Sequence, residues 1–110
     1  MIDETIKQIE AQIQNSESLK PERRAELLEL IAKLKTETGE LAKTDTEQAR
    51  SIVGFTQLST YEATRAAQDP QLLNLSTEGL RQSVAKFEKS HPKLAQLVNT
   101  ISTTLSNSGI

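Results

Sequence analysis

The chain of 110 residues has no cysteine and no tryptophan, only three aromatic residues and one histidine. Without cysteine it has neither a disulfide framework nor a thiolate zinc site, and nothing indicates an oxidising compartment. No segment approaches the roughly 18 apolar residues of a spanning helix, and the N-terminal residues MIDETIKQIE are acidic where a signal peptide would be basic. We therefore expect a cytoplasmic protein that is neither exported nor inserted into a membrane.

Positive charge is also in short supply. The net charge of -2 disfavours a nucleic-acid partner, because affinity for phosphate comes mainly from clustered Lys and Arg. The distribution is uneven: residues 1–50 carry a net -3, residues 51–78 a net -2 and residues 79–110 a net +3. The basic C-terminal third would find a complementary surface on the acidic remainder, either in the same chain or in a second copy.

What the sequence does contain is helical periodicity. In the N-terminal part, apolar residues recur at steps of three and four, as on one face of a helix. The first stripe comprises Ile2, Ile6, Ile9 and Ile13, and the second comprises Leu27, Leu30, Ile31, Leu34 and Leu41, with Leu28 beside it. Pro21 lies between them and suits the first turn of a new helix. The short connection predicts an antiparallel helical hairpin whose stripes face each other.

A third helix is predicted from Thr44 and Glu47, which have the spacing of a capping box. Its inner face is made mostly of small residues: Ala49, Ile52, Thr56, Ser59, Ala63 and Ala66. Because small side chains contribute little apolar burial, we expect Phe55 and Leu58, which flank this face, to supply much of it. Gly54 lies inside the helix at a cost of about 1 kcal/mol relative to alanine, which predicts a kink or a close contact there.

The dipeptide at 69–70, Asp-Pro, is expected to end this third helix, because proline disfavours the helical conformation in the residue before it. Ser76 is the predicted N-cap of the next helix, with Leu75 and Leu80 in the positions of a hydrophobic staple. The fourth helix should therefore begin at about Thr77.

The strongest periodic signal lies in the C-terminal third. Steps of four and three connect eight residues: Leu80, Val84, Phe87, His91, Leu94, Val98, Ile101 and Leu105. Pro92 cannot donate the hydrogen bond that a continuous helix would need, so this helix should be kinked or restarted there. At its end, Gly109 can take a left-handed conformation and Ile110 can fold back on Leu105, as in a Schellman cap.

His91 occupies a core position of this stripe directly before Pro92. We interpret it as a packed residue whose imidazole bonds a backbone carbonyl freed by the proline, with Ser90 capping the restarted segment. The alternative is a metal or small-ligand site in which Glu88 and His91 form the Glu-x-x-His spacing of di-iron helical bundles. Such a site would need a symmetric dimer and further buried carboxylates, and the remaining stripes contain none.

Two polar groups are candidates for interactions. Lys86, Lys89 and Lys93 could meet phosphate, but lysines without interleaved arginine or aromatic residues more often form a solvated face or pair with acidic residues, and we favour pairing with the acidic N-terminal half. Tyr61 and Arg65 point away from the small-residue face of the third helix, and we expect them to lie at an interface with another helix or subunit.

The sequence has no glycine-rich phosphate loop, no Ser-His-Asp set and no run of metal ligands, so we expect neither an enzyme nor a bound cofactor. It predicts one all-α domain over residues 1–110, with four or five helices: an N-terminal hairpin and a long C-terminal helix broken near Pro92. Because narrow stripes and few aromatics make a modest core, we expect a homodimer that completes the bundle. The predicted function is a non-enzymatic protein-interaction or structural role, without a nucleic-acid or membrane partner.

Three segments also carry a resemblance to a known family: FTQLSTYEATR, QDPQLLNLSTEGLRQSV and FEKSHPKLAQLVNTISTTLSNSGI. With them the chain resembles, over nearly its whole length, a family of short bacterial helical proteins described as domain of unknown function 4404. FEKSHPKL and the terminal LSNSGI are the most specific parts. The resemblance implies a bacterial cytosolic helical protein and supplies no activity, cofactor or catalytic residue.

Overall fold

The computed structural model describes residues 2–108, and within this range the chain forms helices and no strand. The elements are α1 (Ile2–Gln14), α2 (Pro21–Ala42), α3 (Thr46–Thr64), α4 (Pro70–Val84), the short 3-10 helix η1 (Ala85–Phe87) and α5 (Pro92–Ser108). The predicted all-α fold with five helices is therefore confirmed.

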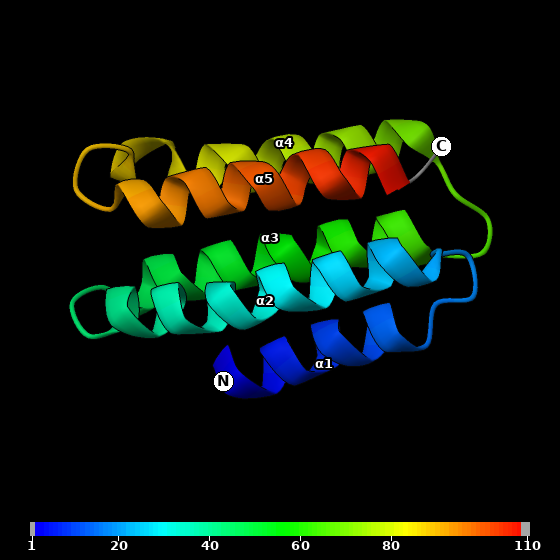
Figure 1. Ribbon diagram of the computed structural model, residues 1–110. Coiled ribbons are helices and arrows are strands. Elements are labelled where there is room, and N and C mark those ends of the chain that lie inside the picture. Colours follow the sequence, from blue (N-terminus) through cyan, green and yellow to red (C-terminus); the bar gives the residue numbers. More distant parts are fainter. Residues whose placement is uncertain (1, 109–110) are drawn as a thin grey trace.

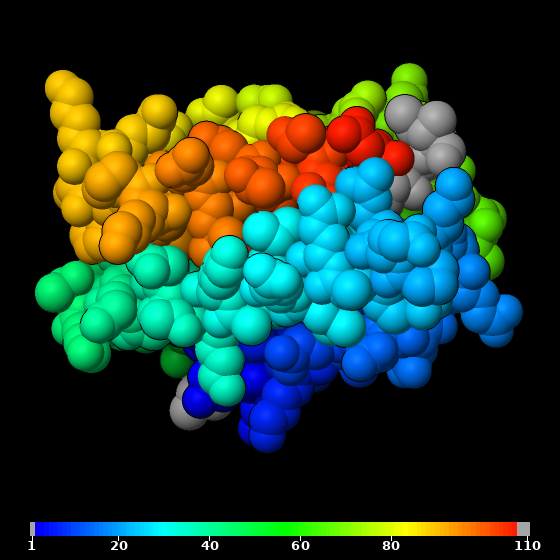
Figure 2. All heavy atoms as spheres, in the orientation of Figure 1, coloured from blue at the N-terminus to red at the C-terminus, as the bar shows by residue number. Residues whose placement is uncertain are grey.

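Consecutive α-helices run in opposite directions along the bundle (Figure 1). α2 and α5 form one layer, and α1, α3 and α4 form the other, behind them in this view. α3 is the central element because it contacts all four of the other α-helices, whereas α1 contacts only α2 and α3 among the described residues. Figure 2 shows the face made by α2 and α5, so the outer surface of α3 and α4 is on the far side.

The N-terminal hairpin forms as its stripes predict. Ile6, Ile9 and Ile13 of α1 are buried, and α2 begins at Pro21. The turn between the helices is held by Arg24, whose Nη2 donates to the carbonyl oxygens of Ser16 at 2.7 Å and Leu19 at 3.2 Å. These bonds satisfy carbonyls that lack helical partners and so fix the turn.

The start of α3 differs from the prediction by one residue. Its N-cap is Asp45, whose Oδ1 accepts from the backbone N–H of Gln48 at 3.1 Å. Thr44 instead donates its hydroxyl to the carbonyl of Leu41 at 3.2 Å, so the capping box of Thr44 and Glu47 is wrong. Asp and Thr both serve as N-caps, and in TDTE the tertiary path of the turn decides between them.

The start of α4 was predicted seven residues too late. α3 ends at Thr64, and Asp69 begins α4 by accepting from the backbone N–H groups of Gln71 and Leu72. Pro70 takes the first helical position, where its missing N–H has no cost. Ser76 is therefore no N-cap; it is buried inside α4 and donates to the carbonyl of Leu73 at 2.9 Å.

The eight-residue stripe of the C-terminal third is divided between two helices. The chain reverses after Phe87, and α5 packs antiparallel to α4, so the two halves of the stripe face each other (Figure 1). Pro92 thus separates two helices rather than kinking one. All members of the stripe are buried except His91, which is partly exposed. The predicted cap at Gly109 and Ile110 lies outside the described residues.

The central helix α3 buries its small-residue face. Ala49, Ile52, Thr56, Ser59 and Ala63 are buried, whereas Ala66 lies beyond the helix and is exposed. Small side chains on this face let the neighbouring helices approach closely, and Val53, Thr60 and Glu62 of α3 are buried as well. The prediction that Phe55 and Leu58 supply it is wrong, because both remain exposed.

Candidate interaction surface

Five large apolar side chains are exposed on the outer surface of α3 and α4. The exposed fractions are 38% for Phe55, 46% for Leu58, 49% for Tyr61, 41% for Leu72 and 70% for Leu75. Their spacing of three residues within each helix places them on one side of that helix, and α3 and α4 pack side by side. We call this set the α3/α4 apolar face. Among the described residues, no other large hydrophobic side chain is exposed.

A close contact between Phe55 and Gly79 joins the two halves of this face. A Cβ atom placed on Gly79 would lie 2.6 Å from Cε1 and 2.9 Å from Cδ1 of the Phe55 ring. Only glycine leaves room for the ring in this position. The absence of a side chain on α4 therefore determines how Phe55 is presented on α3.

Gly54 lies on the same surface but has a different role. A Cβ atom on Gly54 would meet no atom within 4 Å, and α3 continues through it without interruption. The predicted kink or close contact at Gly54 is therefore wrong. Gly54 instead forms the floor of a shallow apolar pocket of about 270 Å³, which is also lined by Ser51, Phe55 and Leu58.

Tyr61 and Arg65 lie together at the other end of the face. The guanidinium carbon of Arg65 lies 5.7 Å from the centre of the Tyr61 ring, within range of a cation–π contact. Arg65 Nη1 also donates to Oε1 of Glu62 at 3.0 Å, and this hydrogen bond raises the pKa of Arg65. The structure thus brings together the two residues that the sequence singled out for an interface and anchors the arginine within its own helix.

The three lysines lie at the reversal between α4 and α5, on η1, on the turn and on the start of α5. Lys86, Lys89 and Lys93 are exposed, and Lys86 Nζ lies 5.4 Å from the centre of the Phe87 ring. None of the five ion pairs between described residues includes them; these pairs are Arg23–Glu26, Lys33–Glu29, Lys43–Glu40, Arg65–Glu62 and Arg81–Glu78. The structure therefore does not show the pairing with the acidic N-terminal half that we expected.

His91 marks the start of α5. Its N–H donates to the carbonyl of Phe87 at 2.7 Å, and its own carbonyl accepts from Ala95 N–H at 3.1 Å, so His91 rather than Ser90 is the residue that precedes the helix. The ring packs edge-on against Phe87 with centroids 5.6 Å apart, and Nδ1 lies 3.1 Å from Ser90 Oγ. The imidazole thus packs against Phe87 but is not in the core, and its hydrogen-bond partner is a hydroxyl and not the predicted freed carbonyl.

The alternative metal site finds no further ligands around Glu88 and His91. Residues 2–108 contain no group of three or more His, Cys, Asp or Glu side chains placed to hold a metal ion. Glu88 is exposed and His91 is engaged with Ser90 and Phe87. The Glu-x-x-His spacing is lost as a helical pair, because the two residues lie on the turn between η1 and α5.

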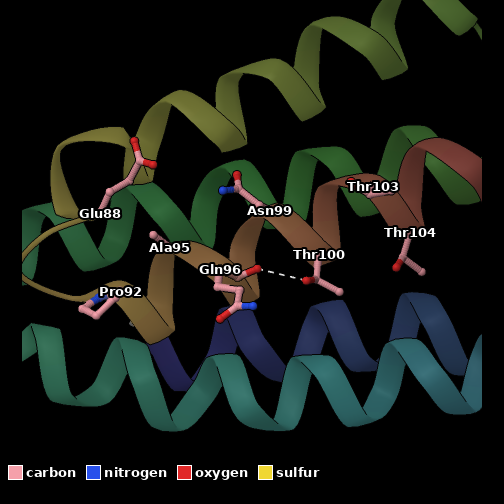
Figure 3. Close-up of a pocket in the computed structure, with 8 residues that line it drawn as sticks. All are labelled: Glu88, Pro92, Ala95, Gln96, Asn99, Thr100, Thr103 and Thr104. Carbon is pink, nitrogen blue, oxygen red and sulfur yellow. Dashed lines mark hydrogen bonds between the residues drawn. The ribbon is translucent and has the colours of Figure 1, made fainter.

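Glu88 instead borders a groove of about 470 Å³ along the exposed side of α5 (Figure 3). The other lining residues all come from α5: Pro92, Ala95, Gln96, Asn99, Thr100, Thr103 and Thr104. Thr100 Oγ1 donates to the carbonyl of Gln96 at 3.0 Å, as drawn in the figure. Amides and hydroxyls can donate and accept hydrogen bonds, and Glu88 is the one carboxylate among the lining residues.

The sequence reasoning missed the contribution of α4 to the apolar face. Leu75 is predicted to lie in a hydrophobic staple and Leu72 is given no role, because the helix is expected to begin at about Thr77. The signal was present: Leu72, Leu75 and Gly79 follow the helical spacing of three and four. Recognising Asp69 and Pro70 as a helix start would have placed all three on one side of a helix.

Comparison with known proteins gives one match. A family model described as "Domain of unknown function (DUF4404)" matches residues 56–110, which is half of the chain. The matched part comprises the C-terminal half of α3 and all of α4 and α5, so it is shorter than the nearly complete resemblance expected from the sequence. No curated protein and no solved structure matches the chain. In the part of the chain that the structure describes, no helix is long and apolar enough to cross a membrane.

Proposed function

We propose that this chain, which belongs to the DUF4404 family, is a non-enzymatic structural protein that forms a homodimer through the α3/α4 apolar face. The observation that carries the proposal is the exposure of five large apolar side chains on two adjacent helices. Large apolar side chains gathered on one surface favour association, because water gains freedom when they are covered.

The size of the face suits a second copy. With about 200 Å² taken for each fully exposed side chain, the five exposed fractions correspond to roughly 500 Å² of side-chain surface. A stable interface buries about 800 Å² per partner, of which somewhat more than half is apolar. The apolar face with its polar border therefore supplies about the area that one subunit of a dimer needs.

The charges next to the face are compatible with contact between identical surfaces. On α3, Arg65 is paired with Glu62 at 3.0 Å, and on α4, Arg81 is paired with Glu78 at 3.4 Å. Each of these two pairs contributes one cation and one anion, so the pairs add no net charge that would make two copies of the face repel each other. These pairs therefore give the face no excess of one sign of charge that would attract a strongly acidic or strongly basic partner.

The test is sedimentation equilibrium of the wild-type protein and two variants that each introduce one negative charge. Leu58→Asp places a charge in the centre of the apolar face, whereas Thr103→Asp places one on the exposed side of α5, in the other layer of the bundle. We expect a wild-type dimer at micromolar concentration, a dimeric Thr103→Asp variant and a monomeric Leu58→Asp variant with unchanged helix content by circular dichroism.

Two results would contradict the proposal. The first is a wild-type protein that sediments as a monomer at micromolar concentration. The second is a Leu58→Asp variant that dimerises as tightly as Thr103→Asp, because burying an unpaired carboxylate in an interface is strongly unfavourable.

A further inference from the structure

The exposed side of α3 carries both a projecting side chain and a hollow. The projection is Tyr61, which is 49% exposed. The hollow is the 270 Å³ pocket over Gly54, and a second hollow of about 290 Å³ adjoins it, because Gly54 also lines a groove towards Ile2 and Thr5 of α1. The sequence predicts a kink or a close contact at Gly54, whereas the structure leaves this space open.

Tyr61 and Gly54 are seven residues apart on one helix. Seven residues span about 10 Å and nearly two full turns, so the two positions differ by only about 20° around the helix axis. Leu58 lies between them, four residues after Gly54 and three before Tyr61. A helix that presents a projecting side chain, Leu58 and a hollow in this order is complementary to a second copy of itself that runs in the opposite direction.

We infer that two copies of the chain pair with their α3 helices antiparallel and crossing at Leu58, so that Tyr61 of each copy fills the Gly54 hollow of the other. This inference rests on the proposed function, of which it specifies the arrangement. A two-fold axis through Leu58 relates the two copies. It brings each residue to the level of the partner residue that is equally far from Leu58 in the other direction along α3. Each residue keeps its sideways displacement from the line of contact between the two helices. Tyr61 is three residues from Leu58 and Gly54 is four, so Tyr61 and the partner's Gly54 differ by one residue, about 1.5 Å, along the helix axis and lie on the same side.

The same axis makes the polar ends of α3 complementary. Arg65 lies seven residues beyond Leu58 and Ser51 lies seven residues before it, so each Arg65 comes opposite the partner's Ser51. Glu47 lies one turn further along, within reach of a long guanidinium side chain. This gives Arg65 an acidic neighbour in the partner in addition to Glu62 in its own chain.

The hollow itself favours an aromatic side chain. Its lining is apolar apart from the edge formed by Ser51, and its floor is a glycine. A tyrosine presents a rigid apolar ring with a polar tip, so its ring can enter such a hollow while the hydroxyl stays at the wet edge. Each copy supplies one ring and one hollow, and the dimer needs no third component.

The first experiment fills the hollow. Gly54→Leu is compared with Gly39→Leu, a matched control on α2, because both glycines are exposed helical residues with no atom within 4 Å of an added Cβ. We expect the dimer dissociation constant of Gly54→Leu to rise about tenfold or more, since overfilling a packed contact is destabilising, and that of Gly39→Leu to stay at the wild-type value.

The second experiment determines the relative orientation of the two α3 helices by cross-linking. Because the chain has no cysteine, only the introduced cysteines can react. Ser51→Cys and Arg65→Cys are prepared separately and treated with a short bifunctional maleimide, alone and as a mixture. The antiparallel arrangement predicts cross-linked dimers in the mixture and none in either variant alone. A parallel arrangement predicts the reverse, because each residue would then lie opposite its own copy.

The outcomes separate this inference from the proposed function. A monomeric wild-type protein overturns both. If Leu58→Asp abolishes the dimer but Gly54→Leu does not, or if Ser51→Cys cross-links to itself, the proposed dimer stands and the arrangement at Leu58 is wrong. Loss of the dimer in Gly54→Leu together with cross-linking only in the mixture supports the arrangement.

Discussion

The contact between Gly79 and Phe55 predicts whether the substitution Gly79→Ala stabilises or destabilises the protein. In an exposed helix interior, Gly→Ala stabilises a protein by about 0.5–1 kcal/mol, because alanine restricts the unfolded chain. Gly39 follows this rule, since nothing lies within 4 Å of its added Cβ. Gly79→Ala should instead destabilise the protein, because the new methyl group would lie 2.6 Å from Cε1 of Phe55.

The size of this effect follows from the burial that the Phe55 ring loses. Carbon atoms pack at about 3.5–4.0 Å, so the Phe55 ring has to move by about 1 Å or swing out into solvent. Phe55 is 38% exposed, and full burial of such a side chain is worth about 1.5–3 kcal/mol, so release of the ring costs about 1–2 kcal/mol. After the gain from alanine, we expect Gly79→Ala to lower the free energy of unfolding by about 0.5–1 kcal/mol.

The assay is urea unfolding at several protein concentrations, so that any contribution from association is separated from the stability of the fold. Gly39→Ala serves as the control and should be stabilising. A double-mutant cycle with Phe55→Ala then isolates the contact: without the ring, Gly79→Ala should become stabilising by about 0.5–1 kcal/mol. The coupling energy between the two positions should be about 1.5 kcal/mol.

Equal stabilisation by Gly79→Ala and Gly39→Ala, with no change when Phe55→Ala is added, would contradict the contact between Phe55 and Gly79. In that case the ring would not rest against Gly79 in solution, and Phe55 would be free to adopt other orientations on the apolar face.

Two further predictions concern the helix starts and a surface ion pair. Asp45→Ala and Asp69→Ala should each lower the free energy of unfolding by about 1 kcal/mol in urea melts, because each aspartate caps a helix. Glu47→Ala should change it by less than about 0.5 kcal/mol. A loss at Glu47 equal to that at Asp45 would indicate that the capping box of Thr44 and Glu47 forms after all. The hydrogen bond from Lys43 at 2.8 Å lowers the pKa of Glu40, so its small stabilising contribution is present at neutral pH and disappears as the pH falls through that lowered pKa. Lys43→Ala should return the pKa of Glu40 to its ordinary value in an NMR titration, and Lys33→Ala should leave it unchanged.

The N-terminal hairpin could be predicted from the sequence because its signals are local and agree with one another. The isoleucine stripe of α1 and the leucine stripe of α2 have the helical period, and Pro21 separates them at a helix start. Periodicity also identified the buried members of the C-terminal stripe, from Leu80 to Leu105. It could not show that the chain reverses in the middle, because two antiparallel helices with facing stripes have the same spacing as one continuous helix.

The candidate surface was only partly predictable. Tyr61 and Arg65 were assigned to an interface from their position opposite the small-residue face, and the structure places them on the exposed side of α3. Phe55 and Leu58 were assigned to burial because large apolar residues are usually buried. Whether a side chain at the edge of a helical stripe is covered depends on which neighbour lies there, and the sequence of one helix does not contain that information.

The sequence by itself determined that this protein is helical and which face of each helix is apolar, because a period of 3.6 residues and the proline positions are properties of the local chain. The tertiary structure decided which of those faces are covered. With α3 in the middle of its layer, its small-residue side is covered by neighbouring helices and its outer side is left open. The close approach of α4 then sets Phe55 against Gly79, through a contact between residues that are far apart in the sequence.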